Sequence, residues 1–482
     1  MGKKYNRNLS MLMDFYELTM ANGYYELGLK DDKVVFDLFY RNNPENGGFV
    51  ICAGLEQAVE YLMNFHFTED DIEYLRSKKI FKEDFLDYLR TAKFTGNVYA
   101  VEEGTIVYPN TPLMTIEANL CEAQLVETML LLCINHQSLI ATKANRIVRA
   151  AKGRVIMEFG ARRAQGADAA IYGTRACYIG GVNSTATVLA DQMFKVPAVG
   201  TMAHSWVQYF DSEYEAFLAY AKIYPQNCLL LVDTYDVIES GIPNAIRVAK
   251  EYLEPNGYRL AGIRIDSGDL AYLSKKVRKM LDKADLKDCK IVVSNSIDEY
   301  LLESLFEQDA KIDSFGVGER MITSKSEPVF GGVYKIVAVN KNGVYEPRIK
   351  VSENIEKITN PCFKKLYRVY DESGMGMFDF LALHDEKVDI ETLELVDEKK
   401  PWKKIDINKN WTIKELQKTI IKDGKLVYDL PSLEEIRNKT FSNLDKVWEE
   451  EKRFSYPHKH YVDLTKKLYE IKCQLLYECE KK

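Results

Sequence analysis

Short runs of apolar residues recur along the middle of the chain, and this pattern restricts the possible folds more than any other feature. The runs lie at residues 155–159, 229–232, 261–265, 291–293 and 314–317. Helical stretches separate several of them, as at residues 244–252 and 270–281. Short apolar runs are typical of buried strands, and strands that alternate with helices are typical of βα units. The pattern therefore predicts an α/β fold built on a parallel sheet or barrel.

Polar residues and glycines follow each run, where the strand is expected to end. They are Gly160, Arg162, Asp233, Asp266, Ser267, Gly268, Asp269, Ser294, Asn295, Gly318 and Glu319. Taken singly, each turn is explained equally well by the ordinary use of Asp, Ser and Gly in turns. Five such turns favour an active site, because α/β barrels carry their active sites at the carboxyl ends of the strands. We therefore expect an enzyme.

Regions on either side of these runs predict further domains. The chain has 482 residues, about three times the length of a typical domain (roughly 150 residues). We expect residues 1–120 to form an N-terminal α/β domain and residues 121–345 to form the barrel. Residues 346–400 are expected to return to the N-terminal domain, and residues 401–482 to form a helical C-terminal extension.

Local patterns give these regions their expected elements. In the N-terminal region a helix is predicted at residues 10–27, a strand at 34–40 and hairpins within 96–118. A helix is predicted at residues 122–151 from the 3.6-residue spacing of its apolar positions. The C-terminal tail from residue 432 is expected to be helical, with a break at Tyr456 and Pro457.

Composition narrows the function class and the compartment. The net charge is −7 and no basic stripe is present, so we expect no nucleic-acid partner. The apolar run at residues 129–134 is far shorter than the ~18 residues that a membrane span needs, and residues 1–6 are not followed by the apolar segment of a signal peptide. Nine cysteines, an odd number at irregular spacing, fit a reducing compartment rather than a disulfide framework. We expect a soluble cytoplasmic protein.

Five motifs occur in an order that resembles a known family. They are DFYELTM at residues 14–20, EFGARR at 158–163, GTMAHS at 200–205, RIDSGD at 264–269 and FGVG at 315–318. Together they resemble the nicotinate phosphoribosyltransferases. The likeness continues through residues 332–335 and 347–350 and into the tail at Pro457 and His458. It covers nearly the whole chain.

The resemblance implies a type II phosphoribosyltransferase, with an irregular α/β barrel and an N-terminal α/β domain. Members of the family join nicotinate to phosphoribosyl pyrophosphate, which gives nicotinate mononucleotide and pyrophosphate. They couple this reaction to ATP hydrolysis through a transient phosphohistidine. Their active sites are shared across a head-to-tail homodimer.

Anionic substrates require local positive charge in a protein that is acidic overall. Arg264 is expected, by similarity, to bind the nicotinate or diphosphate group, and Arg162 to supply a supporting charge, because a guanidinium binds carboxylate or phosphate through two parallel hydrogen bonds. Thr201, in the GTMAHS motif, is placed with the substrate-binding residues by the resemblance. Phe159 and Tyr16 of the partner subunit would enclose the pyridine ring, since flat aromatic faces suit an electron-poor ring.

His204 is the expected phosphoryl acceptor in this family context. A neutral imidazole nitrogen can take a phosphoryl group from ATP and hold it as a labile phosphoramidate. A carboxylate on the other nitrogen would set the tautomer, and Asp233 and Glu158 are the two candidates. Mg²⁺ held mainly through phosphates and water is expected with ATP.

Three further positions bear on substrate binding. Asp266 is expected to accept hydrogen bonds from the ribose hydroxyls and to stabilise oxocarbenium charge. The alternative is that Asp266 caps the following helix, a role for which Asp269 is the other candidate. Gly316 and Gly318 would open the backbone for a phosphate, although Glu319 stands where many relatives carry threonine. Ser184 lies near the position where nicotinamide-using relatives carry an acid, so it favours nicotinate.

Other readings remain as alternatives. The nearest uses nicotinamide in the same reaction, and another is a catalytically inactive scaffold of the same fold that binds a metabolite. A Schiff-base aldolase would need a lysine at a strand end, and the strand ends offer arginine, aspartate and glycine instead. The sequence contains no Gly-x₄-Gly-Lys-Ser/Thr loop for ATP, and His458 and His460 have no cysteine pair to complete a zinc site.

Overall fold

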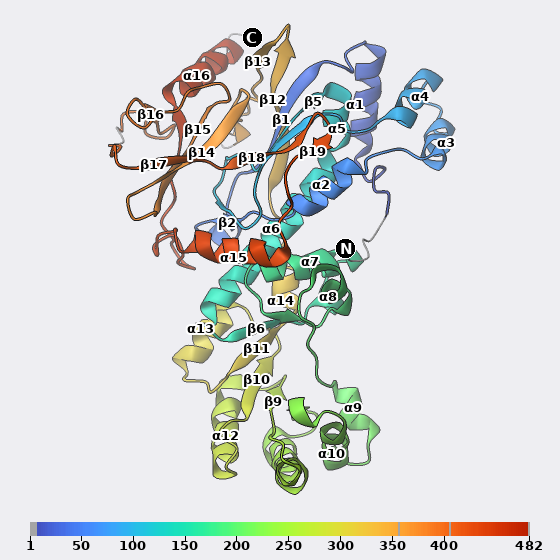
Figure 1. Cartoon of the computed structure of the whole chain (residues 1–482), viewed down its shortest axis with the longest axis vertical. Helices are drawn as coiled ribbons and strands as arrows, with labels where there is room; N and C mark the ends of the chain where they lie inside the picture. The colour runs from blue at the N-terminus through green and yellow to red at the C-terminus, as the bar shows by residue number, and fades with distance from the viewer. Residues whose placement is uncertain (1–6, 355–356, 404–405, 481–482) are drawn as a thin grey trace. The chain divides into compact units, whose positions relative to one another are not determined.

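The computed structural model describes residues 7–354, 357–403 and 406–480. These fall into two compact units (Figure 1). Unit 1 is the continuous segment Ile140–Pro328, and unit 2 combines the described residues of Lys4–Leu139 and Val329–Lys482. Residues 1–6, considered above for a signal peptide, lie outside the described residues.

Unit 1 is built on a six-stranded parallel sheet. Its strands are β6 (Val155–Glu158), β7 (Ser184–Thr185), β8 (Leu229–Leu231), β9 (Gly262–Ile265), β10 (Lys290–Ser294) and β11 (Ser314–Val317). They are ordered β7-β6-β11-β10-β9-β8, and every neighbouring pair is parallel. The sheet curls as an incomplete barrel. The prediction of an α/β fold with an irregular barrel is therefore confirmed, and all five predicted strands are present within one or two residues.

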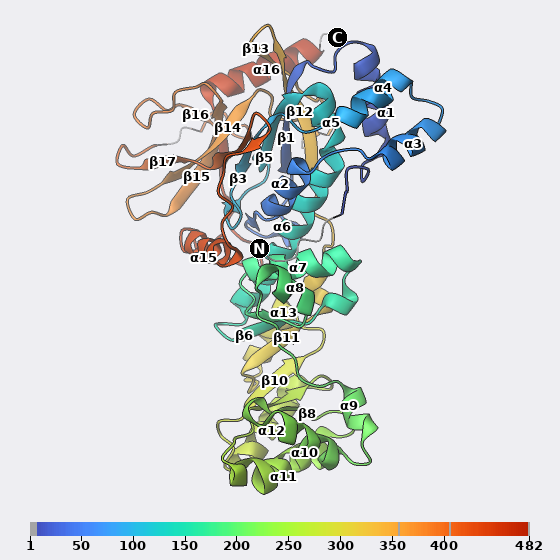
Figure 2. The same ribbon diagram turned by 45° about the vertical axis from the view of Figure 1, so that its right-hand side comes forward.

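Helices follow most of these strands. They are α7 (Ala167–Ile179), α8 (Val188–Phe194), α9 (His204–Tyr209), α10 (Glu213–Ile223), α11 (Ile242–Val248), α12 (Leu270–Lys283), α13 (Glu299–Glu307) and α14 (Glu319–Ile322). Of the two candidates for the cap, Asp269 is the one that caps α12: its carboxylate accepts from the Tyr272 N–H at 2.9 Å. Helices α10, α11 and α12 lie together beside the β8–β9 edge of the sheet (Figures 1 and 2). The loops that precede these helices therefore lie at the carboxyl ends of the strands.

A buried ion cluster joins the two ends of unit 1. Lys143 and Arg146 both pair with the Glu299 carboxylate, at 2.9 and 2.6 Å, and all three side chains are at most 5% exposed. Lys143 Nζ also donates to Ser326 Oγ at 2.9 Å. Charge-assisted hydrogen bonds away from water are directional, so this cluster holds the beginning of the unit against its end.

Unit 2 contains three sheets. The seven-stranded sheet is ordered β13-β12-β1-β5-β3-β18-β19, with β13 (Val344–Pro347), β12 (Gly332–Lys341), β1 (Lys33–Tyr40), β5 (Met114–Asn119), β3 (Asn97–Val101), β18 (Gln417–Lys422) and β19 (Lys425–Leu426). The five-stranded sheet is ordered β16-β20-β15-β14-β17, with β16 (Leu395–Val396), β20 (Val462–Thr465), β15 (Gly376–Leu383), β14 (Lys364–Tyr370) and β17 (Thr412–Glu415). Strands β2 (Val50–Ile51) and β4 (Ile106–Val107) pair separately.

Helices of unit 2 cover these sheets. They are α1 (Phe15–Glu26), α2 (Leu55–Met63), α3 (Glu69–Ser77), α4 (Glu83–Thr91), α5 (Leu120–Leu125), α15 (Leu433–Leu444) and α16 (Lys466–Glu480). A further helix, α6 (Glu127–Ala150), begins in unit 2 and ends in unit 1. The predicted helices at 10–27 and 122–151 correspond to α1 and to α5 with α6.

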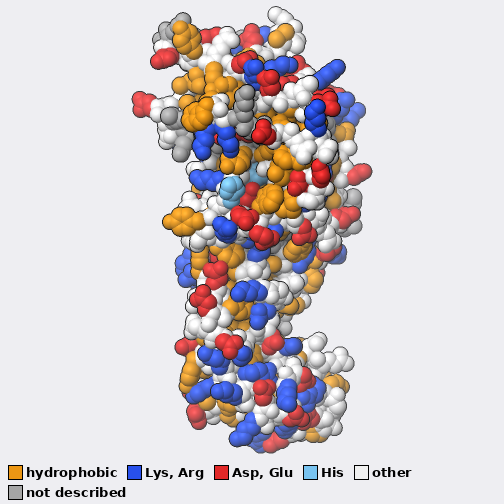
Figure 3. Space-filling view, turned by 90° about the vertical axis from the view of Figure 1, so that its left-hand side faces the viewer, with side chains coloured by type: hydrophobic (Ala, Val, Ile, Leu, Met, Phe, Trp, Pro, Cys, Tyr) orange, Lys and Arg blue, Asp and Glu red, His pale blue; other side chains and the backbone are white. Residues whose placement is uncertain are grey.

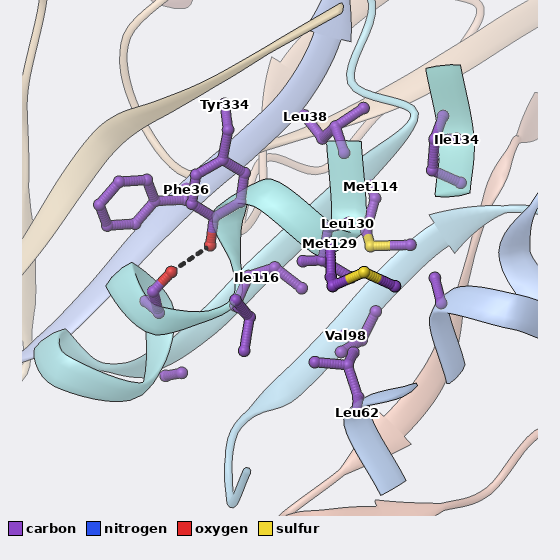
Figure 4. Close-up of a cluster of buried hydrophobic side chains, with 14 of the residues drawn as sticks. Phe36, Leu38, Leu62, Val98, Met114, Ile116, Met129, Leu130, Ile134 and Tyr334 are labelled. Carbon is purple, nitrogen blue, oxygen red and sulfur yellow. Dashed lines mark hydrogen bonds between the residues drawn. The ribbon is translucent and has the colours of Figure 1, made fainter. Parts of the chain in front are cut away.

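The core of unit 2 forms between the large sheet and its helices. Phe36 stacks on Tyr334 with ring centroids 4.7 Å apart, and the Tyr334 hydroxyl donates to the Ala123 carbonyl at 2.9 Å (Figure 4). Met114 and Ile116, on β5, lie in the same fully buried cluster. Strand β12 therefore brings residues from beyond unit 1 into the centre of this core.

Two boundaries differ from the sequence prediction. The units divide at 139/140 and 328/329, whereas the expected barrel ran from 121 to 345. The first boundary falls within α6, which is one continuous helix. Segment 346–400 lies in the same unit as the N-terminal residues.

The C-terminal residues 401–482 contain more than helices. Helices α15 and α16 match the predicted helical character, and Tyr456 and Pro457 lie in the non-helical segment between them. The same region also supplies β17, β18, β19 and β20. Strands β17, β18 and β19 are partly exposed, and β20 is short and contains the polar residues Asp463 and Thr465, so none of them shows the apolar run that marks a buried strand.

Several surface and thiol properties follow from this structure. All nine cysteines are free thiols, and seven of them are buried. Lys and Arg side chains are interspersed with Asp and Glu over the face in Figure 3. No helix among the described residues combines the length and the apolar character that a membrane crossing requires.

His460 lies in a buried polar cluster of unit 2. Its side chain is 1% exposed; Nδ1 is 2.9 Å from Glu451 Oε1 and Nε2 is 3.3 Å from Asp379 Oδ1. Its ring stacks on Tyr108 at 3.6 Å, and Arg368 forks onto both oxygens of Asp379. Both ring nitrogens face carboxylates, an arrangement that favours the protonated ring and leaves neither nitrogen available to a metal.

The cluster gives a pH dependence of stability. Burial acts to lower the pKa of His460, but the hydrogen bonds that Asp379 and Glu451 accept from the ring, together with their negative charges, outweigh it and raise the pKa above its ordinary value of 6.5. The stabilisation is therefore complete below pH 6.5 and is lost as the pH rises through the higher native pKa. We expect urea unfolding to show a decreasing free energy of unfolding above neutral pH, and His460→Gln to flatten this decrease. The exposed His458→Gln variant is the control; an unchanged pH profile in His460→Gln would contradict the assignment.

Candidate active site

Arg264 lies on β9, one residue before the end of the strand, and so close to the residues that follow the strands of unit 1. Its Nη1 donates to Thr201 Oγ1 at 2.9 Å and its Nη2 to the Met202 carbonyl at 3.2 Å. The Nε atom is buried and has no hydrogen-bond partner. Burial lowers the pKa of Arg264, against the opposing effect of Asp266 and Asp233, although a guanidinium remains charged at neutral pH. A buried cationic group with an unused donor is suited to bind an anion.

His204, at the first position of α9, is joined to Asp266 and Thr234. Its Nδ1 is 3.1 Å from Thr234 Oγ1, and its Nε2 is 3.9 Å from Asp266 Oδ2. The side chain is 40% exposed, so it remains accessible to a ligand. The two carboxylates considered from sequence, Asp233 and Glu158, are not its partners.

Asp233 instead organises the loop after β9. Its Oδ2 accepts from the Asp266 N–H at 2.8 Å and from Ser267 Oγ at 2.7 Å. Its Oδ1 is buried without a hydrogen-bond partner. Asp233 thus positions the Asp266 backbone and keeps one acceptor free for a ligand hydroxyl or a hydrated cation.

Asp266 is held from the opposite side by β10. The Ser294 hydroxyl, at the end of that strand, donates to Asp266 Oδ1. Strand β10 pairs in parallel with β9 and with β11, which brings Ser294 level with Gly316. Asp266, Ser294, His204 and Arg264 therefore gather at one edge of the sheet, as their positions at the ends of parallel strands predicted.

Gly316 and Gly318 have packing roles that the sequence did not show. A Cβ at Gly316 would lie 2.5 Å from Cδ2 of Phe159, so the aromatic ring lies directly over this glycine. A Cβ at Gly318 would lie 3.0 Å from the Phe159 carbonyl oxygen. The two glycines thus make room for Phe159, whose ring is half-buried at the same end of the sheet. Their expected phosphate contact remains a prediction.

Glu158 anchors the segment that carries Phe159 and Arg162. Its buried carboxylate accepts from the Gly160 N–H and from the hydroxyls of Thr174 and Thr185, the latter at 2.6 Å. Arg162 is exposed in the short turn Ala161–Arg163, close enough for its charge to lower the pKa of Arg264. The positive charges of Arg162 and Arg264 therefore reinforce each other.

Ser184 and Glu319 lie at the margins of this cluster. Ser184 is 6% exposed on β7 and stands opposite Met157 of β6. Glu319 forms ion pairs with Lys325 and Arg163, at 2.5 and 3.8 Å, and the Lys325 hydrogen bond lowers the pKa of Glu319. Its negative charge is therefore compensated locally.

Tyr16 is the one predicted site residue outside unit 1. It is 44% exposed on α1 of unit 2, where burial and Glu127 raise the pKa of its hydroxyl. Its expected role in a partner's active site stays a prediction.

Sequence reasoning missed Thr234, which holds the imidazole. The available signal was its position directly after Asp233, in the same strand-end turn. Among the described residues, no group of three or more His, Cys, Asp or Glu side chains is arranged to hold a metal ion.

The curled parallel sheet, with an arginine, an imidazole and carboxylates at its strand ends, defines an α/β-barrel enzyme for anionic substrates. Three family models match the chain: the nicotinate phosphoribosyltransferase N-terminal domain at residues 11–135, the nicotinate phosphoribosyltransferase family at 155–372 and the C-terminal domain at 363–472. The chain belongs to the nicotinate phosphoribosyltransferase family.

Individual relatives agree with this assignment over nearly full length. Nicotinate phosphoribosyltransferase of Bacillus subtilis is 43% identical over 473 residues, which cover 98% of this chain and 96% of the relative. The Caenorhabditis elegans nicotinate phosphoribosyltransferase is 34% identical and covers 96% and 92%. The crystal structure of human nicotinic acid phosphoribosyltransferase superposes with a TM-score of 0.86 at 30% identity, covering 96% of this chain and 99% of that one. The fold and the enzyme class expected from the motifs are confirmed.

Proposed function

We propose that this enzyme joins nicotinate to phosphoribosyl pyrophosphate, yielding nicotinate mononucleotide and pyrophosphate for NAD biosynthesis. The observation that carries the proposal is the cluster of Arg264, Asp266, His204 and Asp233. Two of its atoms, Arg264 Nε and Asp233 Oδ1, are buried without hydrogen-bond partners. Unused buried donors and acceptors are costly unless a ligand completes them. The names of the relatives supply the substrates that would do so.

In the transfer step, the glycosidic carbon loses pyrophosphate and gains the pyridine nitrogen. Arg264 would bind the nicotinate carboxylate or a diphosphate oxygen, with Arg162 adding positive charge. Asp266, oriented by Ser294, would accept from the ribose hydroxyls and stabilise the positive charge that develops on the ribose. Phe159 would offer its face to the pyridine ring, with Tyr16 of the partner subunit opposite it in a homodimer.

In the coupling step, His204 would accept the γ-phosphoryl group of ATP. When Nδ1–H donates to Thr234, the lone pair lies on Nε2, which is the nitrogen free to attack phosphorus. The N–P bond forms as the bond to the ADP oxygen breaks, and water later releases phosphate. Mg²⁺ would neutralise the triphosphate, bound mainly through phosphates and water, with the free Asp233 oxygen suited to accept from its hydration shell.

The choice of nicotinate over nicotinamide is proposed from Ser184. Its hydroxyl can donate to a carboxylate, whereas an acid at this position would repel one and accept from an amide. The buried position of Ser184 beside β6 fits a residue that limits the pocket for the ring.

The test is mononucleotide formation from phosphoribosyl pyrophosphate with nicotinate and nicotinamide in parallel, each with and without Mg-ATP. We expect product from nicotinate, stimulated by ATP, and at least about tenfold less from nicotinamide. Equal or greater product from nicotinamide would overturn the substrate assignment. No product from either base would favour a metabolite-binding scaffold, and equal rates with and without ATP would refute the coupling.

A further inference from the structure

A second cavity lies in unit 2, on the five-stranded sheet. Its volume is about 270 Å³. Phe378, Trp411 and Tyr461 supply aromatic surface, and Asp397, Asp406 and Asp463 supply carboxylates. Lys403 is the cation at its wall. All of these residues belong to unit 2, and none belongs to the site described above.

Asp463 is the unusual group in this cavity. It lies on β20 next to Leu464, and because side chains alternate along a strand, Leu464 enters the main core while Asp463 points to the opposite face. Asp463 is 2% exposed, and its Oδ2 is buried without a hydrogen-bond partner. An unpartnered carboxylate in such a position is unfavourable unless a cationic or donor group reaches it.

The other two carboxylates either accept hydrogen bonds or are exposed to solvent. Asp397 Oδ1 accepts from the backbone N–H groups of Lys399 and Lys400, at 2.8 and 3.2 Å, and so closes its own turn. Asp406 is exposed to solvent. Asp463 Oδ2 is therefore a buried carboxylate oxygen of this cavity that lacks a hydrogen-bond partner.

The aromatic wall already accommodates an ammonium group. Lys403 Nζ lies 4.4 Å from the centroid of the Tyr461 ring, within the range of a cation–π contact. Trp411 meets Phe378 edge-on with centroids 6.3 Å apart, and Phe378 is buried. The lining that the structure describes contributes three carboxylates and one ammonium group, so in the ionised state it is net negative and disfavours anions such as nicotinate or phosphate.

We propose that this cavity binds a small organic cation: a protonated amine on an aromatic or aliphatic body, with the ammonium group on Asp463 and the body against Trp411 and Tyr461. The ammonium group supplies the donor that Asp463 lacks, through a charge-assisted hydrogen bond. The apolar body replaces water on the aromatic wall. The cavity volume restricts the ligand to a single ring or a short chain.

The experiment is calorimetric titration of the full chain with 2-phenylethylammonium in an amine-free phosphate buffer at pH 7.5. We expect a dissociation constant below about 1 mM, and at least about tenfold weaker binding of the neutral analogue 2-phenylethanol. The proposal would be overturned if the amine showed no binding at concentrations up to about 10 mM, tenfold above the expected limit of the dissociation constant. It would also be overturned if the alcohol bound as tightly as the amine.

Variants identify the site. Asp463→Asn keeps the shape and removes the charge, and we expect at least about tenfold weaker amine binding. Asp429→Asn, an exposed acid of the same unit, is the matched control and should bind as the wild type does. Tyr461→Leu is a second variant at a half-exposed position, and it should also weaken binding. If Asp463→Asn folds and binds the amine with wild-type affinity, the site is refuted. If Asp463→Asn does not fold, wild-type affinity in Tyr461→Leu refutes the site instead.

The pH dependence supplies an independent readout. Burial raises the pKa of Asp463 to about 6; Asp397 and Glu398 act in the same direction, and Lys403 and His460 oppose them. The amine requires the ionised carboxylate, so binding should be complete above neutral pH and about tenfold weaker at pH 5. An affinity that does not change between pH 7.5 and pH 5 would contradict the role of Asp463.

Discussion

Replacing His204 by alanine is expected to abolish ATP hydrolysis, by at least about 100-fold, and to remove the stimulation of mononucleotide synthesis by ATP. The reason is that the variant lacks the nitrogen that we propose as the phosphoryl acceptor, while Arg264 and Asp266, proposed for the transfer step, remain in place. Slow synthesis without ATP should therefore persist. Phosphate release and mononucleotide formation, measured on the same sample, separate the two effects.

Two further variants sharpen this test. Thr234→Val keeps the imidazole but removes the hydroxyl 3.1 Å from Nδ1, so we expect an intermediate loss of ATP hydrolysis with synthesis without ATP unchanged. His458→Ala, at an exposed position of unit 2, should hydrolyse ATP at the wild-type rate. ATP hydrolysis at the wild-type rate in His204→Ala would show that another group accepts the phosphoryl.

Arg264→Lys is expected to lower kcat/KM for mononucleotide formation by about 100-fold or more, although the charge is conserved. Arg264 uses one nitrogen on Thr201 and another on the Met202 carbonyl, which leaves Nε for a ligand. A lysine ammonium is a single point of charge, so it cannot donate to Thr201, to the Met202 carbonyl and to a ligand in these three directions at once. Steady-state kinetics with varied nicotinate and varied phosphoribosyl pyrophosphate will show which substrate is affected.

The control for this variant is Arg259→Lys. Arg259 is an arginine of the same unit that pairs with Asp288 and Glu254 away from the strand ends, so its replacement should leave kcat/KM within about twofold. If Arg264→Lys also stays within about threefold of the wild type, a guanidinium is not required at this position.

The central sheet could be predicted from sequence because its strands are buried on both faces. Such strands appear as uninterrupted apolar runs, and Ile291, Val292 and Val293 of β10 illustrate this. The polar residues that follow them gather by topology alone, so Asp233, Asp266 and Ser294 could be expected to meet at one edge.

Other features depended on contacts that no local pattern contains. The role of Gly316 is set by the Phe159 ring from another strand, and the tautomer partner of His204 comes from Thr234, thirty positions further along the chain. Strands β17 and β18 escaped prediction because Thr412–Glu415 and Gln417–Lys422 are rich in polar residues, and their pairing with β14 and β3 is a tertiary effect. Asp463 likewise reads as an ordinary strand-edge acid until its burial is known.

The interruption of unit 2 by unit 1 has a consequence for the order in which the chain folds. Strands β1 and β3 emerge early in synthesis, but their partners β12 and β18 lie beyond residue 328. Unit 1 is continuous in sequence and can fold before those partners exist. Once it has folded, the contact of Lys143 with Ser326 holds the two ends of the insertion together. A very long loop is thereby shortened to a brief connection, and the entropic cost of bringing β12 back to β1 falls accordingly. The folding of unit 1 thus helps β12 and the strands beyond it to reach the sheet that β1, β5 and β3 begin.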